Sequence, residues 1–511
     1  MFKDHPKGLI PAALSNMGER FGYYIMNAVL VLFLCSKFGL DEETSGLIYS
    51  VFYAGIYVLS LVGGYIADRT QNYKGTITRG IIIMAVGYAI LAVPILATAE
   101  NRIQLLVLTC VGLFLIAFGN GLFKGNLQAI VGQLYDNPQY ASKRDAGFQI
   151  FYVFINVGGL IAPFIAPALR SWWLSVHSLQ YNAQLPALAH QYLDGTIDAN
   201  GVNSLNELVG KVGGTLAEAP DALANFCTQY LDIFNTGIHY SFVASVAAML
   251  ISLSIFLWCK NTLPNPAKRE AVTSVQYTAE EKLAMAKEIR QRMYALFAVL
   301  GIVVFFWFSF HQNGTSLSFF ARDFVVTDAV APEIWQAVNP FFVIVLTPLI
   351  MLLFSSLAAR GKAISTPMKI AYGMGIAALA YIFLSVFCQQ VGYPSAEEFR
   401  ALDPSTAEGL KSGFWIMFVL YFFLTVAELF ITPLGLSFVS KVAPKNMQGL
   451  CQGLWLGATA VGNSLLFLGP KMYNTMPIWM AWAVFAGICL ISMGVMLGMV
   501  KWIERVTTDA E

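Results

Sequence analysis

Long apolar runs follow one another along the whole chain, separated by shorter polar segments. A run of about 20 apolar residues is long enough to cross a bilayer as a helix, whereas the strands of an outer-membrane barrel would appear as short alternating segments. The pattern predicts an all-α membrane protein with twelve transmembrane helices, near residues 9–35, 44–67, 77–98, 103–132, 146–169, 237–259, 293–320, 333–358, 366–390, 410–440, 447–469 and 477–502.

The composition supports this prediction and narrows the possible partners. Of the 511 residues, 57% are hydrophobic and 12% are charged, which is far more apolar than an ordinary soluble domain. The net charge of +1 provides no basic field for nucleic acid, so we expect no nucleic-acid partner. The seven cysteines show no Cys-x-x-Cys or other metal-ligand spacing, so we expect them to pack, and we expect no metal and no cofactor.

The distribution of lysine and arginine between the loops predicts how the chain is oriented in the membrane, and the spans and loops together divide it into domains. Lysine and arginine are concentrated in the loops on one side of the predicted spans, and the positive-inside rule places that side, with both termini, in the cytoplasm. We divide the chain into an N-terminal bundle of five helices (1–170), an extracytoplasmic insert (171–236), a sixth helix that completes the bundle (237–260), a cytoplasmic linker (261–292) and a C-terminal bundle (293–511).

The linker carries its own helix signal. Its second part, TAEEKLAMAKEIRQR, begins with a capping-box pattern from Thr278 to Glu281, which predicts an amphipathic helix on the membrane surface. A plain connecting segment is the alternative. Six spans on each side of this linker indicate two bundles around a central cavity, as in a transporter whose halves rock against each other.

Charged residues inside the first span indicate where that cavity lies. In the stretch NMGERFGYYIMN, six polar or aromatic residues recur at helical spacing and therefore share one face: Asn16, Glu19, Arg20, Tyr23, Tyr24 and Asn27. An unpaired charge at the bilayer centre costs about 3 kcal/mol or more, so this face is expected to line a polar cavity. The alternative is that Glu19 and Arg20 form a structural ion pair.

Lys124 and Glu428 are the other clear charges within the spans, and they come from different halves of the chain. A cation in one bundle and an anion in the other would suit a ligand with one charge at each end, of which a zwitterion is the simplest. Eight further polar or aromatic residues in the spans could together line a pocket: Tyr53, Tyr57, Asn156, His311, Gln312, Asn339, Thr432 and Trp455.

Six motifs in order along the chain resemble those of the proton-coupled oligopeptide transporters of the major facilitator superfamily: GERFGYY, GGYIADR, GNGLFKGN, FYVFINVGGLIAP, NPFF and ELFITPLGLSF. The resemblance covers nearly the whole chain except the 171–236 insert. It implies the major facilitator fold, with twelve helices in two six-helix bundles. It also implies a secondary active transporter that imports di- and tripeptides by alternating access, as a monomer in a bacterial-type inner membrane.

The resemblance also implies roles for individual residues. Arg20 and Lys124 would attract the peptide carboxylate, while Glu428 with Asn156 and Asn339 would hold the amino terminus. Side-chain pockets would be formed by Tyr23, Tyr24, Tyr57 and Trp455, and Thr432 belongs to the same expected substrate site. A site of this kind clamps the charged termini and tolerates many side chains in an adaptable aromatic pocket.

Three positions depart from the family pattern, and all three are usually tied to proton coupling. Asn16 replaces the first glutamate of the first motif, Asn27 stands where many members carry arginine, and His311 lies where an acidic residue is common. We expect proton coupling through an atypical site that uses Glu19, His311 or Glu428, since an imidazole titrates near neutral pH. A weakly coupled peptide facilitator and a carrier of another small zwitterion or organic anion are the alternatives.

Two other classes fit the sequence poorly. The spans contain no His-Glu-x-x-His motif, no paired catalytic aspartates and no Ser-His-Asp spacing, so we expect no enzyme. The charges are asymmetric rather than arranged in rings, which argues against a channel. The expected partners are therefore di- and tripeptides, protons and the lipid bilayer.

Overall fold

The structure, a computed structural model, describes residues 4–40, 42–98, 100–182, 185–216, 219–264, 279–314, 316–326, 335–402, 406 and 409–508. Within these ranges, eleven helices are long and apolar enough to cross a membrane. They are α1 (Leu9–Phe38), α2 (Glu42–Thr70), α3 (Tyr73–Ala92), α4 (Arg102–Leu134), α6 (Arg144–Val176), α9 (Ala222–Trp258), α11 (Ala279–Phe310), α13 (Trp335–Ala359), α14 (Thr366–Val391), α17 (Trp415–Val442) and α20 (Ile478–Thr508). The prediction of an all-α membrane protein is confirmed.

The predicted span at 447–469 is not among the eleven long helices. It forms α18 (Gln448–Ser464), a helix of 17 residues, and the chain then turns into α19 (Leu468–Thr475). Helix α18 packs against α2, α4, α11 and α17, so it contacts both halves of the molecule. A helix enclosed by protein in this way does not need the continuous apolar surface of a lipid-facing one.

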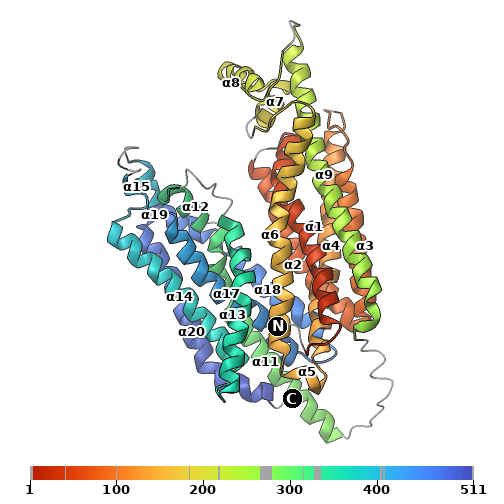
Figure 1. The fold of residues 1–511 in the computed structure, drawn as a ribbon, viewed down its shortest axis with the longest axis vertical. Helices are drawn as coiled ribbons and strands as arrows, with labels where there is room; N and C mark the ends of the chain where they lie inside the picture. The colour runs from red at the N-terminus through yellow and green to blue at the C-terminus, as the bar shows by residue number, and fades with distance from the viewer. Residues whose placement is uncertain are drawn as a thin grey trace.

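The long helices form two groups that follow the order of the chain. Helices α1, α2, α3, α4, α6 and α9 pack mainly with one another, and α11, α14, α17 and α20 form a second group, whose helices α13 and α18 pack extensively against the first group as well. Figure 1 shows the two groups side by side, with both termini at one end of the molecule and the ribbons diverging towards the other. We call the end with the termini the terminal end and the opposite end the cap end.

The two halves approach each other closely where α2 meets α18. A Cβ added to Gly64 would lie 2.4 Å from the carbonyl oxygen of Gly449, so only glycine fits there. Nearby, the Asp68 carboxylate of the GGYIADR motif accepts the backbone N–H groups of Gly449 at 2.9 Å and Leu450 at 2.7 Å. A carboxylate in this position satisfies free N–H groups in the first turn of α18 and interacts favourably with its dipole.

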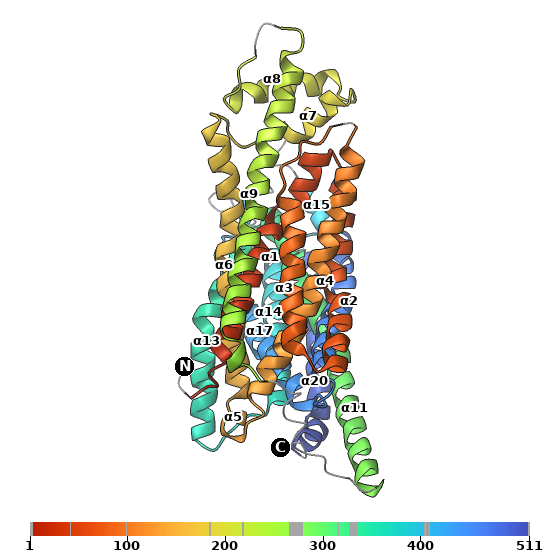
Figure 2. The same ribbon diagram turned by 90° about the vertical axis from the view of Figure 1, so that its right-hand side faces the viewer.

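The insert between the fifth and sixth spans is shorter than the sequence suggested. Helix α6 continues to Val176 and α9 begins at Ala222, which leaves residues 177–221 for the cap with its helices α7 (Leu185–Leu193) and α8 (Ala199–Lys211). Figure 2 shows both short helices at the outer end of α9. The early start of α9 has a packing reason, because Phe226, Tyr230 and Phe234 are buried at helical spacing and α9 packs against α7.

Two predictions around α11 differ from the structure. The helix expected on the membrane surface is not separate, because α11 runs without a break from Ala279 into the membrane span; Thr278, the expected cap, lies outside the described residues. The span predicted to reach residue 320 ends at Phe310 and is followed by a 3-10 turn, His311–Gly314, and by α12 (Ser316–Phe324). The Asn313-Gly314 pair favours this interruption, since both residues are weak helix formers.

Candidate functional site

A cavity of about 210 Å³ lies between the two halves. Its walls are formed by α1, α2, α4 and α6 from the first half and by α11, the 3-10 turn after it, α17 and α18 from the second. The structure brings together these residues of the predicted site: Arg20, Tyr24, Tyr57, Lys124, Asn156, His311, Glu428, Thr432 and Trp455. The wall also contains Asn16, Tyr53, Gln128, Tyr152, Ile155, Trp307, Leu436, Leu456 and Thr459.

Glu19 and Arg20 form a buried ion pair at the first-half wall. Arg20 donates from Nε to Glu19 Oε2 at 2.6 Å and from Nη2 to Oε1 at 2.7 Å. Asn120 on α4 adds a third hydrogen bond to Glu19 Oε1 at 2.7 Å. This two-point geometry is the strongest form of an arginine–carboxylate contact. Glu19 and Arg20 therefore form the ion pair that was the alternative interpretation of the sequence, and Arg20 also lines the cavity.

Lys124 is the cavity cation that lacks a carboxylate. Within the part of the chain that the structure describes, its ammonium makes no salt bridge, and its closest aromatic contact is the Tyr57 ring, 5.3 Å from Nζ to the centroid. A contact of this kind provides about 0.5–2 kcal/mol, less than the cost of burying an ammonium. Lys124 is therefore positioned to bind an anionic group that enters the cavity.

Glu428 is held by hydrogen bonds from both halves. Tyr152 on α6 donates to Oε1 at 2.5 Å, and Asn339 on α13 donates from Nδ2 to Oε2 at 2.7 Å. Asn339 also donates to the Thr425 hydroxyl at 3.1 Å. Although Asn339 is not part of the cavity wall, its amide orients the carboxylate that is.

His311 directly follows α11 and lies in the cavity wall formed by the second half, whereas Lys124 lies in the wall formed by the first half. Its Nδ1 is 2.5 Å from Asn463 Oδ1 on α18, and its ring stacks on Trp307 with centroids 4.8 Å apart. Because the amide oxygen accepts, Nδ1 carries the hydrogen in this geometry. In the neutral ring, Nε2 is then the acceptor.

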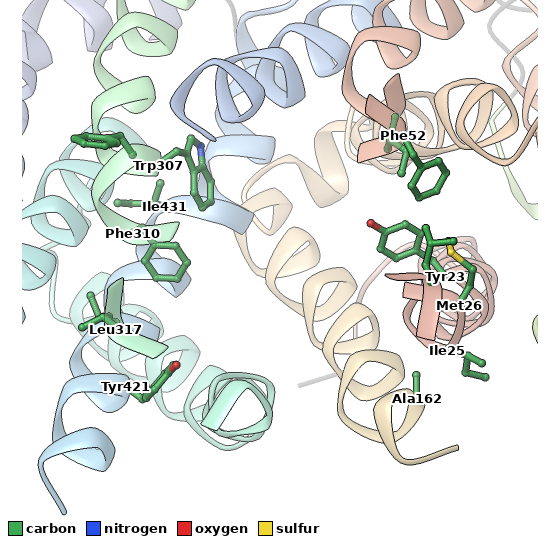
Figure 3. Close-up of a cluster of buried hydrophobic side chains, with 14 of the residues drawn as sticks. Tyr23, Ile25, Met26, Phe52, Ala162, Trp307, Phe310, Leu317, Tyr421 and Ile431 are labelled. Atoms are coloured by element: carbon green, nitrogen blue, oxygen red, sulfur yellow. The ribbon is translucent and has the colours of Figure 1, made fainter. Parts of the chain in front are cut away.

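Tyr23 does not reach the cavity wall among the described residues. Its side chain is 5% exposed and belongs to the hydrophobic core, and Figure 3 shows it in one group with Met26 and Phe52. The Arg20 guanidinium lies 4.7 Å from the Tyr23 ring centroid. Tyr23 thus supports Arg20 from behind in this conformation, and its expected contact with a ligand side chain stays a prediction.

Asn27 also makes a local contact. Its Oδ1 accepts a hydrogen bond from the Tyr49 hydroxyl of α2 at 3.0 Å. The contact joins two helices of the first half.

Two prolines help to shape the second-half wall. Asn339 directly precedes Pro340 inside α13, and Thr432 directly precedes Pro433 inside α17. A proline within a helix removes one backbone hydrogen bond and bends the chain locally. The Thr432 hydroxyl is buried and has no hydrogen-bond partner among the described residues, so it is available to a ligand in the cavity.

Sequence reasoning missed Tyr152 and Asn120. Each lies four residues before a residue that was predicted, Tyr152 before Asn156 and Asn120 before Lys124, and so shares its helix face. That spacing was the available signal. Neither residue carries a charge, so neither violates the apolar pattern enough to be noticed.

The chain was compared with known proteins at family, sequence and structure level. A family model described as the POT family matches residues 74–276 and 267–481. The chain belongs to the POT family. Among curated relatives, dipeptide and tripeptide permease B of Shigella dysenteriae is 28% identical to this POT family member over 517 residues, covering 96% of this chain and 94% of the permease.

Further relatives agree with this assignment. The peptide transporter YePEPT of Yersinia enterocolitica is 27% identical and covers 90% of this chain and 87% of its own. A crystal structure of peptide transporter POT in complex with sulfate has a TM-score of 0.60, 21% identity and coverage of 99% and 97% of the two chains. A POT family transporter in complex with 5-aminolevulinic acid has a TM-score of 0.60, 20% identity and 98% coverage of both. The solved structures establish the major facilitator fold.

Proposed function

We propose that this protein imports di- and tripeptides by alternating access. The observation that carries the proposal is the charge pattern of the central cavity, in which the unpaired Lys124 belongs to the first half and Glu428 to the second. A short peptide carries an anion at one end and a cation at the other, so it can join the two halves. The permease and transporter names of the relatives support the same substrate class.

The proposed binding mode follows from the donors and acceptors on each wall. Lys124, with the Arg20 guanidinium near it, binds the peptide carboxylate, and Glu428 binds the ammonium together with Asn156 and Asn339. Tyr24, Tyr57 and Trp455 contact the peptide side chains, and Thr432 offers its free hydroxyl. Main-chain termini are common to all short peptides, so this mode accepts many sequences.

We further propose that the terminal end is the cytoplasmic side of a bacterial-type inner membrane, with the cap outside. Transport then requires the contacts between the halves at the terminal end, such as Asp68 with the start of α18, to break when the cavity opens to the cytoplasm. The lysine and arginine bias of the loops supports this orientation.

Proton coupling in this proposal uses an atypical site. The positions of Asn16 and Asn27 hold no titratable group, which leaves Glu19, His311 and Glu428 as candidates. His311 is the candidate closest to the family's usual acidic position, and in its neutral form it has an acceptor nitrogen that is not used by Asn463. A weakly coupled facilitator would have the same cavity but no response to a pH gradient.

The deciding experiment is uptake of labelled dialanine into liposomes that contain the purified protein. We expect saturable uptake that unlabelled di- and tripeptides inhibit, and no inhibition by N-acetylated dialanine, which lacks the ammonium. If no short peptide is bound or carried while another zwitterion or organic anion is, the peptide assignment is wrong.

A further inference from the structure

A second cavity, of about 250 Å³, lies at the cap end of the first half. Its walls come from the last turn of α1, the loop between α3 and α4, the cap helix α7, and α9. None of its lining residues belongs to the central cavity. Four basic or imidazole side chains line it: Lys37, Arg102, His190 and His239.

Lys37 is buried in this wall without a countercharge. Its relative exposure is 6%, and its Nζ lies 2.9 Å from His239 Nε2. Within the described part of the chain, no carboxylate oxygen comes within 4.0 Å of this ammonium. Lysine is almost never buried in this way unless a negative group is paired with it.

His239 orients the ammonium but does not neutralise it. The His239 Nδ1 is 2.6 Å from the carbonyl oxygen of Leu91, and because a carbonyl only accepts, Nδ1 must donate. In the neutral ring, Nε2 then accepts one hydrogen bond from Lys37. The Phe33 and Phe38 ring centroids lie 5.2 and 5.8 Å from Nζ, but among the described residues two N–H groups of Lys37 have no hydrogen-bond acceptor and its charge has no carboxylate partner.

The other basic groups of the cavity are already balanced. Arg102 forms a two-point ion pair with Asp194, both distances being 3.1 Å. His190 donates from Nε2 to the Ser36 carbonyl at 2.6 Å, and burial lowers the pKa of His190, which keeps its ring neutral. The Nε of Arg102 is buried without an acceptor among the described residues. Lys37 therefore lacks a neighbouring negative charge, and several N–H groups of the wall lack acceptors among the described residues.

We propose that this cavity binds a small monocarboxylate, with Lys37 as its countercharge. The limit of one charge comes from Asp232, an exposed carboxylate in the outer wall. Asp232 lies seven residues before His239 on α9, which is about 10 Å along the helix axis, so a second negative charge on the ligand would be repelled. The proposal does not depend on the function of the central cavity.

The test is equilibrium dialysis of labelled acetate against the purified full-length protein. We expect a saturable component that is lost in Lys37→Met and retained in Lys37→Arg. It should also be retained in Lys124→Met, which removes the free cation of the central cavity and so separates the two sites. Lys211→Met is the matched control, because Lys211 is an exposed lysine of the cap helix α8.

A second variant tests the same site without altering a buried residue. Asp232→Asn removes the exposed rim charge and should tighten acetate binding about two-fold, the size expected for unit charges about 10 Å apart in water. A saturable acetate component that survives Lys37→Met in folded protein that also carries Lys124→Met overturns the proposal. If Lys37→Met does not fold, unchanged acetate affinity in Asp232→Asn overturns the proposal. If the parent protein shows no saturable acetate binding, the proposal is also wrong, and Lys37 and His239 form a purely structural contact.

Discussion

The Tyr152 hydroxyl donates a 2.5 Å hydrogen bond to Glu428 and thereby joins α6 of the first half to α17 of the second. With Asn339 on the other oxygen, both oxygens of the carboxylate have a donor from the protein. A ligand ammonium must share these oxygens or displace a donor. In the proposed mode of binding, Glu428 would therefore couple ligand binding to the contact between the two halves.

Replacing Glu428 by Gln keeps the shape of the side chain and removes its charge. Peptide affinity should fall by about 1.5–3 kcal/mol, the range for a hydrogen bond to a charged group. The measurement is the binding constant for dialanine, compared with that for N-acetylated dialanine, which the substitution should affect little.

Glu207→Gln is the control for this substitution, because Glu207 lies on the exposed surface of α8. Unchanged affinity for dialanine in Glu428→Gln, together with equal acceptance of the acetylated peptide, would contradict the proposed role of Glu428.

The residues that the sequence identified best are those that conflict with their surroundings. Glu19, Arg20, Lys124 and Glu428 stand out because a charge within a membrane span is costly and needs a polar environment. Tyr152 and Asn120 are neutral, common in helices and uninformative until the helices are packed. Tyr23 lies on the predicted polar face of α1 but packs into the core, because only part of that helix face borders the cavity.

The fold was predictable to the level of its long helices, and their ends were not. The apolar pattern located every long span, since a bilayer imposes length and composition on it. The outer turns of α6 and α9 and the break after Phe310 depend on contacts with the cap and on local helix propensity. A hydropathy pattern records neither of these.

At the terminal end, Asp145 on α6 binds Lys369 at 2.8 Å and Lys441 at 3.1 Å, on α14 and α17 of the other half. Ser437 also donates to it, at 2.6 Å. Asp145→Asn should weaken this contact by up to about 3 kcal/mol, because the buried Lys369 and the partly buried Lys441 lose their shared countercharge. The terminal end should then open more often.

Opening can be measured by labelling Cys451, which is fully buried in α18, in a variant whose other cysteines are replaced. A polar maleimide should react faster with Cys451 in Asp145→Asn than in the parent. Asp194→Asn, which breaks an ion pair at the cap end, should leave the rate unchanged. Equal rates in the parent and Asp145→Asn would show that Asp145 does not hold the halves together.

The cap should loosen in acid because of His190. Burial is the main cause that lowers the pKa of His190 below its ordinary value of 6.5, so the unfolded chain binds more protons than the folded one as the pH falls through that value. The cap is therefore most stable above about pH 6.5 and loses stability as the pH falls, because the buried ring must then carry a charge although its Nε2 can still donate to Ser36.

The protection of α7 amides against hydrogen exchange, measured relative to the intrinsic rate at each pH, should therefore be smaller at about pH 5 than at about pH 7.5. The Asp194–Arg102 pair beside the ring should persist, since this pair lowers the pKa of Asp194. His190→Gln, which can still donate but cannot be protonated, should remove the difference. A difference that remains in His190→Gln would assign the acid sensitivity to another group.

Proton coupling is the last prediction, and it concerns His311. Glu19 is already committed to Arg20 and Asn120, whereas the neutral His311 ring uses Nδ1 for Asn463 and keeps Nε2 as an acceptor at the cavity wall. Uptake of dialanine driven by an inward proton gradient should therefore be lost in His311→Ala and in His311→Gln, while exchange of peptide across the membrane without a gradient should persist. Liposomes with an imposed pH gradient and potential provide the measurement, and Glu19→Gln provides the comparison. Concentrative uptake that survives in both His311→Ala and Glu19→Gln would leave Glu428 as the coupling group among the three, and a parent protein that only equilibrates dialanine would be a facilitator.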